Sequence, residues 1–426
     1  MSIKLNGATS GSVELDVPAV VGSDLQLTLP TTAGEFSVKD ANGNVEVTSI
    51  NSVNFPNVGA LSNRNFVING AMTVAQRSTA AVTNVVSFSA NIKYDAIDRW
   101  GYWASNASKF TVQQVTDAPP GFYNSLKITS SASTTHSAGD GYTISQRVEA
   151  QNLYQASLGT ANAKNLVVSF WVKSTTTGTF SFYALGYGLA QSFVQNFTIN
   201  SAETWEYKTI NIPGPTSGNY SNTPSDYGLE IGFTLGAGSN WDTSTLGSWQ
   251  NTAFQISSTT AVNVLGVATR TLQITGVQLE IGDKATSFEH RSYSDEFVNC
   301  QRYYQTINNN PTPYSNQGLS AIPLWYSANT YASTRWALPV VMRAPATTTV
   351  VGSPGNQSTT GTDGTIGVYY GNWQSTNTWT LIATETTQNS VRLNASNLPN
   401  GAIYAAAGLY FYGTSRTSSV NLDAEL

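Results

Sequence analysis

Short apolar runs recur along this sequence, each alternating with polar residues and each bounded by a cluster of Gly, Pro, Asn or Ser. A succession of such runs without long helical patterns between them is typical of an antiparallel β-sandwich. Between residues 61 and 290 we expect about eight strands, a number that favours a jelly roll. The expected strands are Lys109–Thr116, Ser125–Ser130, Gly141–Val148, Asn165–Lys173, Gly178–Gly186, Trp205–Ile212, Leu229–Leu235 and Leu272–Ile281.

The stretch from Thr271 to Thr306 changes its period part-way and separates two β regions. It begins with the alternation of a half-buried strand, and Gly276 then shifts the phase as a bulge residue would. Beyond Ser292, which is a candidate N-cap, apolar residues recur at helical spacing. These residues are Phe297, Cys300, Tyr303 and Tyr304. We therefore expect a short helix that links the two β regions.

The predicted fold class is all-β, and the chain is expected to have four parts. An N-terminal β segment occupies residues 1–60, and the jelly-roll-like sandwich occupies residues 61–290. The linking helix spans residues 291–306, and a C-terminal β-sandwich domain spans residues 307–426. The first part carries a hairpin signal at Asn42-Gly43 but only short strands, which bury little core. It is either a small module or flexible leader, or a docking segment whose core is completed by other chains.

Charge is scarce in this chain: 20 basic and 25 acidic residues make up 11% of it, against roughly 25% in average globular proteins. Without a basic patch, nucleic acid is not expected as a partner. The single cysteine, Cys300, excludes an intrachain disulfide. The N-terminus lacks the pattern of a signal peptide, and the longest weakly polar run is too short to span a bilayer, so we expect no membrane insertion.

Several motifs between residues 61 and 306 occur together in a known kind of protein. They are NRNFVINGAM, Gln76-Arg77, Asp98-Arg99-Trp100, SFWVK and LQITGVQLEIGDKATSFEHRSYSDEFVNCQRYYQ. This set resembles the carbohydrate-binding-module-like sandwich of bacteriophage tail fibres and tail collar-type proteins. A weaker similarity in the first 40 residues is to the N-terminal segments of tail-fibre proteins from marine and cyanobacterial phages.

The resemblance implies a non-enzymatic homotrimer in the phage virion, assembled in the host cytoplasm. Such a tail fibre would attach to host polysaccharide or lipopolysaccharide through many weak contacts. Its N-terminal segment would dock onto other tail proteins. In a trimer, Phe297, Cys300 and Tyr304 could meet around the axis instead of packing on their own chain. The alternatives are a purely structural adaptor, collar fibre or decoration protein and, with less support, a glycan depolymerase tailspike.

Aromatic residues among polar ones suggest where a glycan would bind, because flat rings stack on the C–H faces of sugars while polar side chains bond to hydroxyls. The segment GVYYGNWQSTNTW has this mixture, and NWD lies in a long loop rich in Gly and Ser. The candidate ligand-binding residues are Tyr369, Asn372, Trp373, Gln374, Trp241 and Asp242. Each ring could instead belong to the core or to a trimer interface.

The charged motifs are interpreted as structural. Asp98-Arg99-Trp100 predicts a buried arginine–carboxylate pair, with Glu289 as a possible partner of Arg77 or Arg99. The acidic end of the chain is expected on the surface. The carboxylates show no paired spacing of a glycosidase, and no metal or nucleophile motif occurs. We therefore expect no catalytic residues, no metal and no cofactor; a calcium site near Asp140 is a minor alternative.

Overall fold

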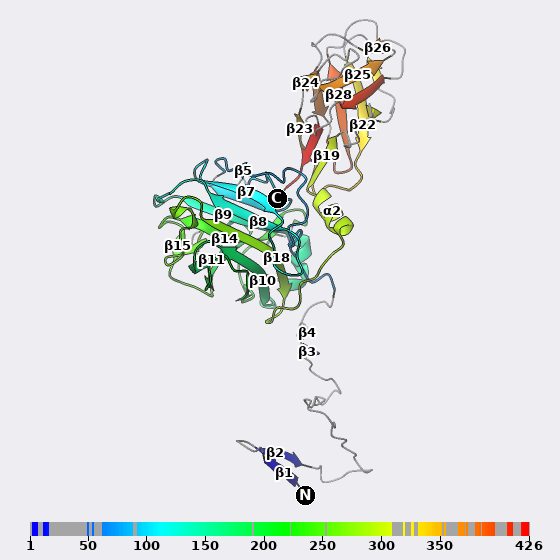
Figure 1. Cartoon of the computed structure of the whole chain (residues 1–426). Helices are drawn as coiled ribbons and strands as arrows, with labels where there is room; N and C mark the ends of the chain where they lie inside the picture. The colour runs from blue at the N-terminus through cyan, green and yellow to red at the C-terminus, as the bar shows by residue number, and fades with distance from the viewer. Residues whose placement is uncertain are drawn as a thin grey trace, which may run out of the picture. The chain divides into compact units, whose positions relative to one another are not determined.

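A computed structural model describes much of the chain. The described residues are 2–6, 12–16, 49–50, 53–54, 62–87, 92–189, 191–221, 223–251, 254–308, 318–319, 325–327, 331–351, 353–354, 365–370, 372–373, 380–384, 386–396, 407–411 and 419–425. The chain divides into two compact units, Met1–Thr48 and Ser49–Leu426. Figure 1 shows the elements of both units.

The first unit contains one antiparallel hairpin. Strand β1 (Ser2–Asn6) pairs with β2 (Ser12–Asp16), and the apolar residues Ile3 and Leu15 are directly opposite each other. The hairpin predicted at Asn42-Gly43 lies outside the described residues. In the second unit, the short strands β3 (Ser49–Ile50) and β4 (Val53–Asn54) pair before the sandwich begins.

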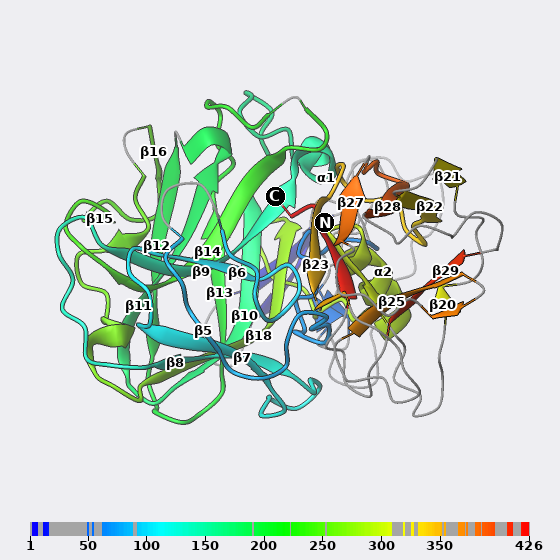
Figure 2. The same cartoon turned by 90° about the horizontal axis from the view of Figure 1, so that it is seen from above.

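Two six-stranded antiparallel sheets form the sandwich (Figures 1 and 2). The first, called here the β10 sheet, has the order β13-β10-β18-β8-β7-β5. Its strands are β13 (Glu206–Ile212), β10 (Leu166–Ser174), β18 (Thr271–Ile281), β8 (Ser125–Ser130), β7 (Phe110–Val115) and β5 (Val82–Thr83). Strands β7 and β8 are sequence neighbours, but the other adjacent strands in this order are separated along the chain, as a jelly roll requires.

The second sheet, called here the β14 sheet, has the order β16-β12-β11-β14-β9-β6. Its strands are β16 (Trp249–Gln250), β12 (Ser192–Ile199), β11 (Gly178–Gly186), β14 (Tyr227–Ala237), β9 (Gly141–Glu149) and β6 (Gly101–Ala104). All eight predicted strands are confirmed, with ends that shift by at most two residues. Strands β6, β12 and β16, which complete this sheet, are absent from the prediction.

The core lies between the two sheets, because alternate residues of each strand point inward. Phe170 of β10 meets Phe233 of β14 edge-on, with ring centroids 4.8 Å apart, and Phe182 of β11 packs on the other side of Phe233. Each such buried ring contributes about 1.5–3 kcal/mol relative to an exposed one. This aromatic centre fixes the two sheets face to face and leaves their outer faces free to differ.

Strand β18 contains the predicted bulge. Its pairing with β10 shifts register between Ser169 and Trp171, opposite Gly276, and Gly276 has a φ of 61°. A Cβ atom there would lie 2.6 Å from Cζ of Phe122 and 3.1 Å from the Trp171 ring. Only glycine combines this left-handed conformation with so close an approach of two rings.

The predicted linking helix is present as α2 (Tyr293–Gln301), with Ser292 accepting a 3.1 Å hydrogen bond from the backbone N–H of Asp295. It is shorter than the predicted range of 291–306, because strand β19 (Tyr304–Asn308) already begins at Tyr304. Cys300 and Tyr304 are buried within their own chain. The idea that they meet around a trimer axis is therefore wrong for these two residues. Burial raises the pKa of the Cys300 thiol well above its usual value, as expected of a small core residue.

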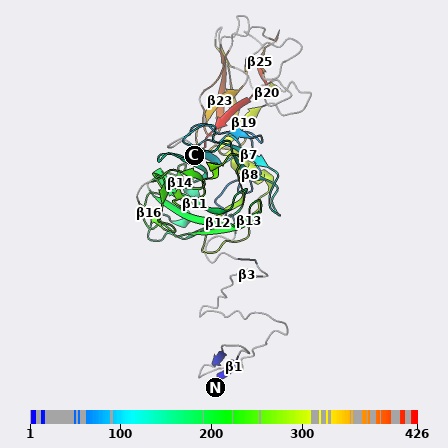
Figure 3. The same ribbon diagram turned by 60° about the vertical axis from the view of Figure 1, so that its left-hand side comes forward.

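Beyond α2 the described residues form three further sheets, which appear in yellow to red in Figure 3. The first joins β19 (Tyr304–Asn308), β30 (Ser419–Asp423) and β23 (Thr347–Val351). The second contains β20 (Gly318–Leu319), β29 (Ala407–Phe411), β25 (Thr365–Tyr370), β24 (Ser353–Pro354) and β26 (Asn372–Trp373). The third contains β21 (Trp325–Ser327), β22 (Tyr331–Ala337), β28 (Ser390–Ser396) and β27 (Thr380–Thr384).

The all-β prediction is thus correct. Apart from α2, the helical elements of the described chain are α1 (Ala150–Leu153) and three single-turn 3₁₀ segments, namely η1 (Tyr154–Ala156), η2 (Tyr187–Leu189) and η3 (Val264–Gly266). A small parallel pair, β15 (Asp242–Thr243) with β17 (Ser257–Ser258), lies in the loop that covers the outer face of the β14 sheet. Within the described residues, every helix is too short or too polar to cross a membrane.

Candidate functional site

The outer face of the β10 sheet carries a ladder of aromatic and polar residues. Trp171 is opposite Tyr207 of β13, and two residues along each strand Ser169 is opposite Thr209. The next pair of residues on this face includes Asn211 of β13. Because alternate residues of a strand share a face, Tyr207, Thr209 and Asn211 form one row along the edge strand.

Two rings form the aromatic end of this ladder. The centroids of Trp171 and Tyr207 are 5.4 Å apart, and their planes meet at 53°. Tyr207 is 45% exposed and Trp171 is half-buried. Burial raises the pKa of Tyr207, so its hydroxyl stays protonated at neutral pH. The pair therefore offers solvent a broad apolar surface with a neutral hydroxyl beside it.

A cleft of about 670 Å³ lies over these rings, with the connector of residues 283–288 as its wall. The wall is fixed from below by Glu280, a buried residue of β18. Its carboxylate accepts hydrogen bonds from the backbone N–H (2.8 Å) and hydroxyl (2.7 Å) of Thr286 and from the amide of Gln278 (2.9 Å). Arg64 lies 3.5 Å from the same carboxylate. The cleft is consequently formed before any ligand arrives.

Aromatic packing holds the far end of the wall. Phe288 meets Phe122 edge-on at 5.0 Å between ring centroids, and His290 lies 4.8 Å from Phe288 and 5.2 Å from Phe122. Phe122 is the ring that approaches Gly276. The bulge, the wall and the Trp171 ring are therefore parts of one packed arrangement, to which His290 also belongs.

A second aromatic group lies on the same outer face. The carboxylate of Asp117 accepts hydrogen bonds from Lys173, from Gln273 (3.0 Å) and from the indole N–H of Trp205 (3.3 Å). Burial acts to raise the pKa of Asp117, but these bonds outweigh it and lower the pKa. The ammonium of Lys173 lies 5.3 Å from the Trp205 ring centroid. Trp205 is thus held in place two residues before Tyr207.

The predicted binding residues of the C-terminal region lie on two paired strands. Tyr369 is on β25, Asn372 and Trp373 are on β26, and Tyr369 is directly opposite Trp373. Gln374 lies outside the described residues. The structure therefore brings three of these four residues together at one turn, at the level of the backbone, and their role in binding stays a prediction.

Trp241 and Asp242 lie on the other side of the sandwich, in the loop over the β14 sheet. The Trp241 indole N–H donates a 2.7 Å hydrogen bond to the carbonyl of Gly139, and its ring meets Phe254 edge-on at 5.3 Å. Trp241 is half-buried against a small apolar cluster that includes Trp103 and Tyr183. These contacts anchor the loop, and a role of Trp241 and Asp242 in binding stays a prediction.

Sequence reasoning missed Trp171 and Tyr207. Trp171 lies within the apolar run LVVSFWV, where residues of both faces are hydrophobic, so periodicity hides the one that points outward. The segment EYKTINI carried a usable signal, because Tyr207, Thr209 and Asn211 alternate with residues that include Ile210 and Ile212. A tyrosine in the polar phase of an edge strand is a candidate contact residue.

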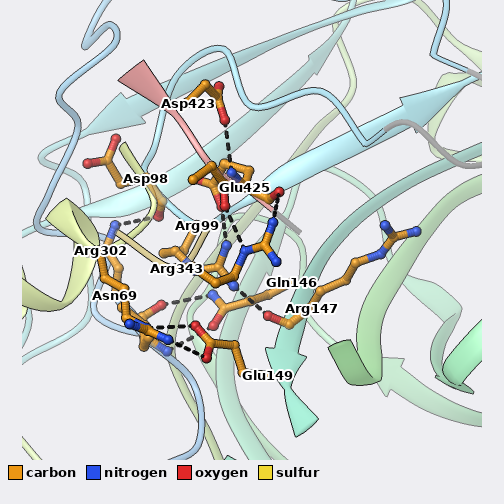
Figure 4. A network of polar contacts seen from close by, with 12 residues as sticks. Asn69, Asp98, Arg99, Gln146, Arg147, Glu149, Arg302, Arg343, Asp423 and Glu425 are labelled. Atoms are coloured by element: carbon orange, nitrogen blue, oxygen red, sulfur yellow. Dashed lines mark hydrogen bonds and ion pairs between the residues drawn. The ribbon is translucent and has the colours of Figure 1, made fainter. Parts of the chain in front are cut away.

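The Asp98-Arg99-Trp100 motif belongs to a separate, buried network (Figure 4). Arg99, which is 1% exposed, pairs with the carboxylate of Glu425 and stacks on Tyr303, with 3.6 Å from its guanidinium carbon to the ring centroid. The predicted buried arginine–carboxylate pair is therefore confirmed. The suggested partner was wrong, because Glu289 instead accepts a 3.0 Å hydrogen bond from the backbone of Asn65 and lies 3.9 Å from Arg291.

Arg77 extends this network. Its guanidinium lies 3.0 Å from Asp423, 3.4 Å from Glu425 and 3.5 Å from Asp98, and it stacks on the Tyr304 ring at 3.8 Å. Burial raises the pKa of Asp98 to about 6, although Arg77 and the hydrogen bonds from Gln76 oppose the shift. Arg77 thus connects one loop of the sandwich to the end of the chain.

Arg343 and Arg302 complete the set, which we call the ionic junction. Arg343 donates to the backbone carbonyls of Ala424 (2.7 Å), Glu425 (2.9 Å) and Ser225 (2.6 Å). Arg302 holds Glu149 with two hydrogen bonds of 2.8 and 2.9 Å. The end of the chain is therefore fastened inside the protein. The expectation of an acidic surface tail is wrong for Glu425, whose carboxylate is buried and pairs with Arg77 and Arg99. The Asp423 carboxylate, which pairs with Arg77, stays 43% exposed.

The ionic junction lacks the features of a reactive site. Its carboxylates are engaged by arginines, and its guanidinium groups point at those carboxylates or at backbone carbonyls. Among the residues that the structure describes, no group of three or more His, Cys, Asp or Glu side chains is arranged to hold a metal ion. The cleft is therefore the stronger candidate for a functional site.

Comparison with known proteins gave structural likeness without sequence matches. No protein-family model and no curated protein matches the sequence. Tailspike protein 4 of bacteriophage CBA120, in its enzymatically active domain, is similar at 14% identity and a TM-score of 0.28, over 51% of this chain and 21% of that one. The chain thus spans about a fifth of the tailspike.

Two carbohydrate-binding modules are similar over half of the chain. A family 11 module of a cellulosomal cellulase from Clostridium thermocellum has 14% identity and a TM-score of 0.25, over 50% of this chain and 99% of the module. The module TmCBM61, solved with β-1,4-galactotriose, has 12% identity and a TM-score of 0.27, over 51% and 99%. At these identities the likeness concerns the fold alone.

Proposed function

We propose that this chain binds a glycan non-covalently in the cleft over Trp171 and Tyr207, and that it does so as a bacteriophage tail-fibre protein. The observation that carries the proposal is the pair of rings beneath a preformed cleft, with Tyr207 open to solvent. The ligand would be a polysaccharide or lipopolysaccharide of the host surface. The tail-fibre role rests on the sequence motifs described above.

The chemistry of the cleft fits a sugar chain. The apolar faces of Trp171 and Tyr207 suit the C–H faces of a pyranose ring, and the exposed side chains of Thr209 and Asn211 reach hydroxyl groups farther along the strand. Four alternate positions of β13 and its approach, from Trp205 to Asn211, span about 20 Å at about 3.3 Å per residue. That length accommodates several sugar residues in a row.

Binding without cleavage is part of the proposal. Among the residues that line the cleft, Asp283 is the one carboxylate, and it accepts a 2.7 Å hydrogen bond from Asn165. Glycoside hydrolysis ordinarily needs two carboxyl groups across the scissile bond, about 5–9.5 Å apart. The lining of the cleft therefore favours adhesion over hydrolysis.

Weak binding by one cleft would be multiplied by assembly. In a homotrimer, and in several fibres on one virion, linked sites raise avidity by about 10²–10⁴ over a single site. Residues 1–60 would attach each chain to other tail proteins. The low charge of the surface suits this setting, because contacts between uncharged groups are insensitive to salt.

A glycan microarray probed with the full-length chain tests the binding function. We expect binding to a limited group of glycans, lost in Trp171→Ala and Tyr207→Ala and kept in Tyr123→Ala, which removes a still more exposed ring outside the cleft. Equal binding by all four proteins would contradict the cleft. Release of new reducing ends from a bound glycan would contradict adhesion without hydrolysis.

Labelled antibodies against the chain test its place in the virion. Labelling at the far end of the tail is expected of an attachment fibre. Labelling at the neck or on the capsid would instead support a structural adaptor or decoration protein. Sedimentation of the full chain gives the oligomeric state, for which a trimer is expected.

A further inference from the structure

A second pocket, of about 430 Å³, lies apart from the cleft and shares no lining residue with it. It is bounded by the segment from Asn63 to Ile68, by α1 and η1, and by α2. Its volume falls within the roughly 300–1,000 Å³ of small-molecule sites. Six of its nine lining residues carry carboxamides, namely Asn63, Asn65, Gln151, Asn152, Gln155 and Asn299.

Most of these carboxamides are open to a ligand. Asn65 is engaged, since its oxygen accepts from the backbone N–H groups of Val67 and Leu279. The side chains of Asn63, Asn152, Gln155 and Asn299, in contrast, form no hydrogen bond within the part of the chain that the structure describes. A carboxamide offers two N–H donors and an acceptor oxygen, so four of them around one pocket suit a ligand that carries both kinds of group.

The charges around the pocket do not suit an anionic ligand. Arg291 is its one charged lining residue, and its guanidinium donates to the backbone carbonyls of Asn65 (2.6 Å) and Val67 (3.2 Å). Glu296 and Glu289 lie 3.6 and 3.9 Å from it. These two carboxylates outnumber the one cation of the lining, which disfavours an anionic ligand.

A small apolar area lies among the carboxamides. It is made by Phe66, which is buried, and Ile68, which is half-buried. The backbone of Ile68 is fixed on both sides, because its N–H donates to the side chain of Gln146 and its carbonyl accepts from it, each at 2.8 Å. This area is too limited for a flat ring to stack on, but it suits a methyl group.

We propose that this pocket binds one N-acetylated hexosamine residue of an uncharged glycan. The acetamido N–H and carbonyl pair with the free carboxamides, the acetyl methyl rests on Phe66 and Ile68, and the sugar hydroxyls take the remaining donors and acceptors. A hexose without the acetamido group leaves the apolar area empty and forms fewer of these bonds. The pocket would act independently of the cleft, so either site could be correct without the other.

Saturation-transfer NMR with the full-length chain tests the proposal. The probes are methyl N-acetyl-β-glucosaminide, methyl N-acetyl-α-galactosaminide, methyl β-glucoside and the peptide analogue N-acetylglycine methylamide. We expect saturation of the acetyl methyl of at least one acetamido sugar, and affinity for the glucoside at least tenfold weaker, since two or three net hydrogen bonds and a methyl contact are lost.

Variants place the signal. The double variant Asn152→Ala/Gln155→Ala should weaken acetamido-sugar binding about tenfold, and Asn299→Ala about threefold. Asn162→Ala, an exposed asparagine outside the pocket, and Trp171→Ala should leave it unchanged. Unchanged melting temperatures would show that the variants fold. If the double variant does not fold, Asn299→Ala alone tests the pocket.

Three outcomes would overturn the assignment. Equal binding of the glucoside would remove the acetamido group from recognition. Equal binding of the peptide analogue would make the pocket a peptide site. Full binding by the double variant would place the sugar elsewhere, and loss in Trp171→Ala would place it in the cleft. None of these results would contradict glycan binding by the cleft, which the microarray tests separately.

Discussion

The cleft and the ionic junction each place an aromatic ring beside polar groups, and they differ in burial. In the cleft, Tyr207 is exposed and its neighbour Trp171 is half-buried beneath open space. In the junction, Tyr303 is 1% exposed and lies under the guanidinium of Arg99, whose partner Glu425 is also buried. An aromatic ring beside polar groups therefore indicates a binding surface only where solvent reaches it; elsewhere the same group fastens distant parts of the chain.

The most severe test of this contrast is Glu425→Ala. The substitution leaves Arg99 charged, buried and without its carboxylate, and breaking a buried pair in this way costs about 3–5 kcal/mol. Urea unfolding should show that loss, whereas Asp242→Ala, a carboxylate in the loop over the other sheet, should stay within about 0.5 kcal/mol of the unchanged protein. A similar small effect for both would mean that the junction does not stabilise the fold.

A matched pair of tyrosine substitutions compares the two regions directly. Tyr303→Ala removes a buried ring and should lower the free energy of unfolding by about 3–5 kcal/mol. Tyr207→Ala removes an exposed ring and should lower it by less than about 1 kcal/mol while abolishing binding on the glycan array. If Tyr207→Ala destabilised the protein as much as Tyr303→Ala, its ring would belong to the core and the cleft would lose its support.

Asp98 should give the junction a pH dependence that the cleft lacks. Its pKa in the folded chain is raised to about 6, above the usual value of a carboxyl group, so the folded state holds this proton more tightly than the unfolded state. Stability from this group is therefore present at low pH and is lost as pH rises toward 6. At about 1.4 kcal/mol per pKa unit the change amounts to about 3 kcal/mol.

The variant Asp98→Asn isolates this contribution, because the other carboxyl groups titrate in both proteins. Between pH 4 and pH 7 the difference in unfolding free energy should move in favour of the variant by about 1–3 kcal/mol and then level off. Urea unfolding at a series of pH values measures it. A difference that does not change with pH would show that Asp98 is already ionised at pH 4 in the folded chain.

How far the sequence predicts these regions depends on how local each feature is. The eight expected strands, the Gly276 bulge and the Ser292 cap depend on neighbours within a few residues and were predictable. The partner of Arg99 was not, because Glu425 is 326 positions away and no periodicity connects them. The role of Tyr207 could be predicted only in part. The alternation in EYKTINI reveals a polar face, but it does not show that residues 283–288 form a wall that makes this face a cleft.

Gly276→Ala is expected to cost less stability than Glu425→Ala or Tyr303→Ala, and it connects packing to the cleft. The alanine would have to adopt a φ of 61°, and its Cβ atom would lie 2.6 Å from Cζ of Phe122. Together the backbone strain and the clash cost about 1–3 kcal/mol. Phe122 supports Phe288 in the wall, and the Trp171 ring lies 3.1 Å from the same Cβ. Both sides of the cleft should therefore shift, so glycan binding should weaken several-fold while the junction is unaffected.

Gly139→Ala, in a loop on the other side of the sandwich where the nearest atom lies 3.9 Å away, is the matched control. If Gly276→Ala lost stability but kept full binding, the cleft would tolerate movement of its wall, and the rings alone would account for recognition.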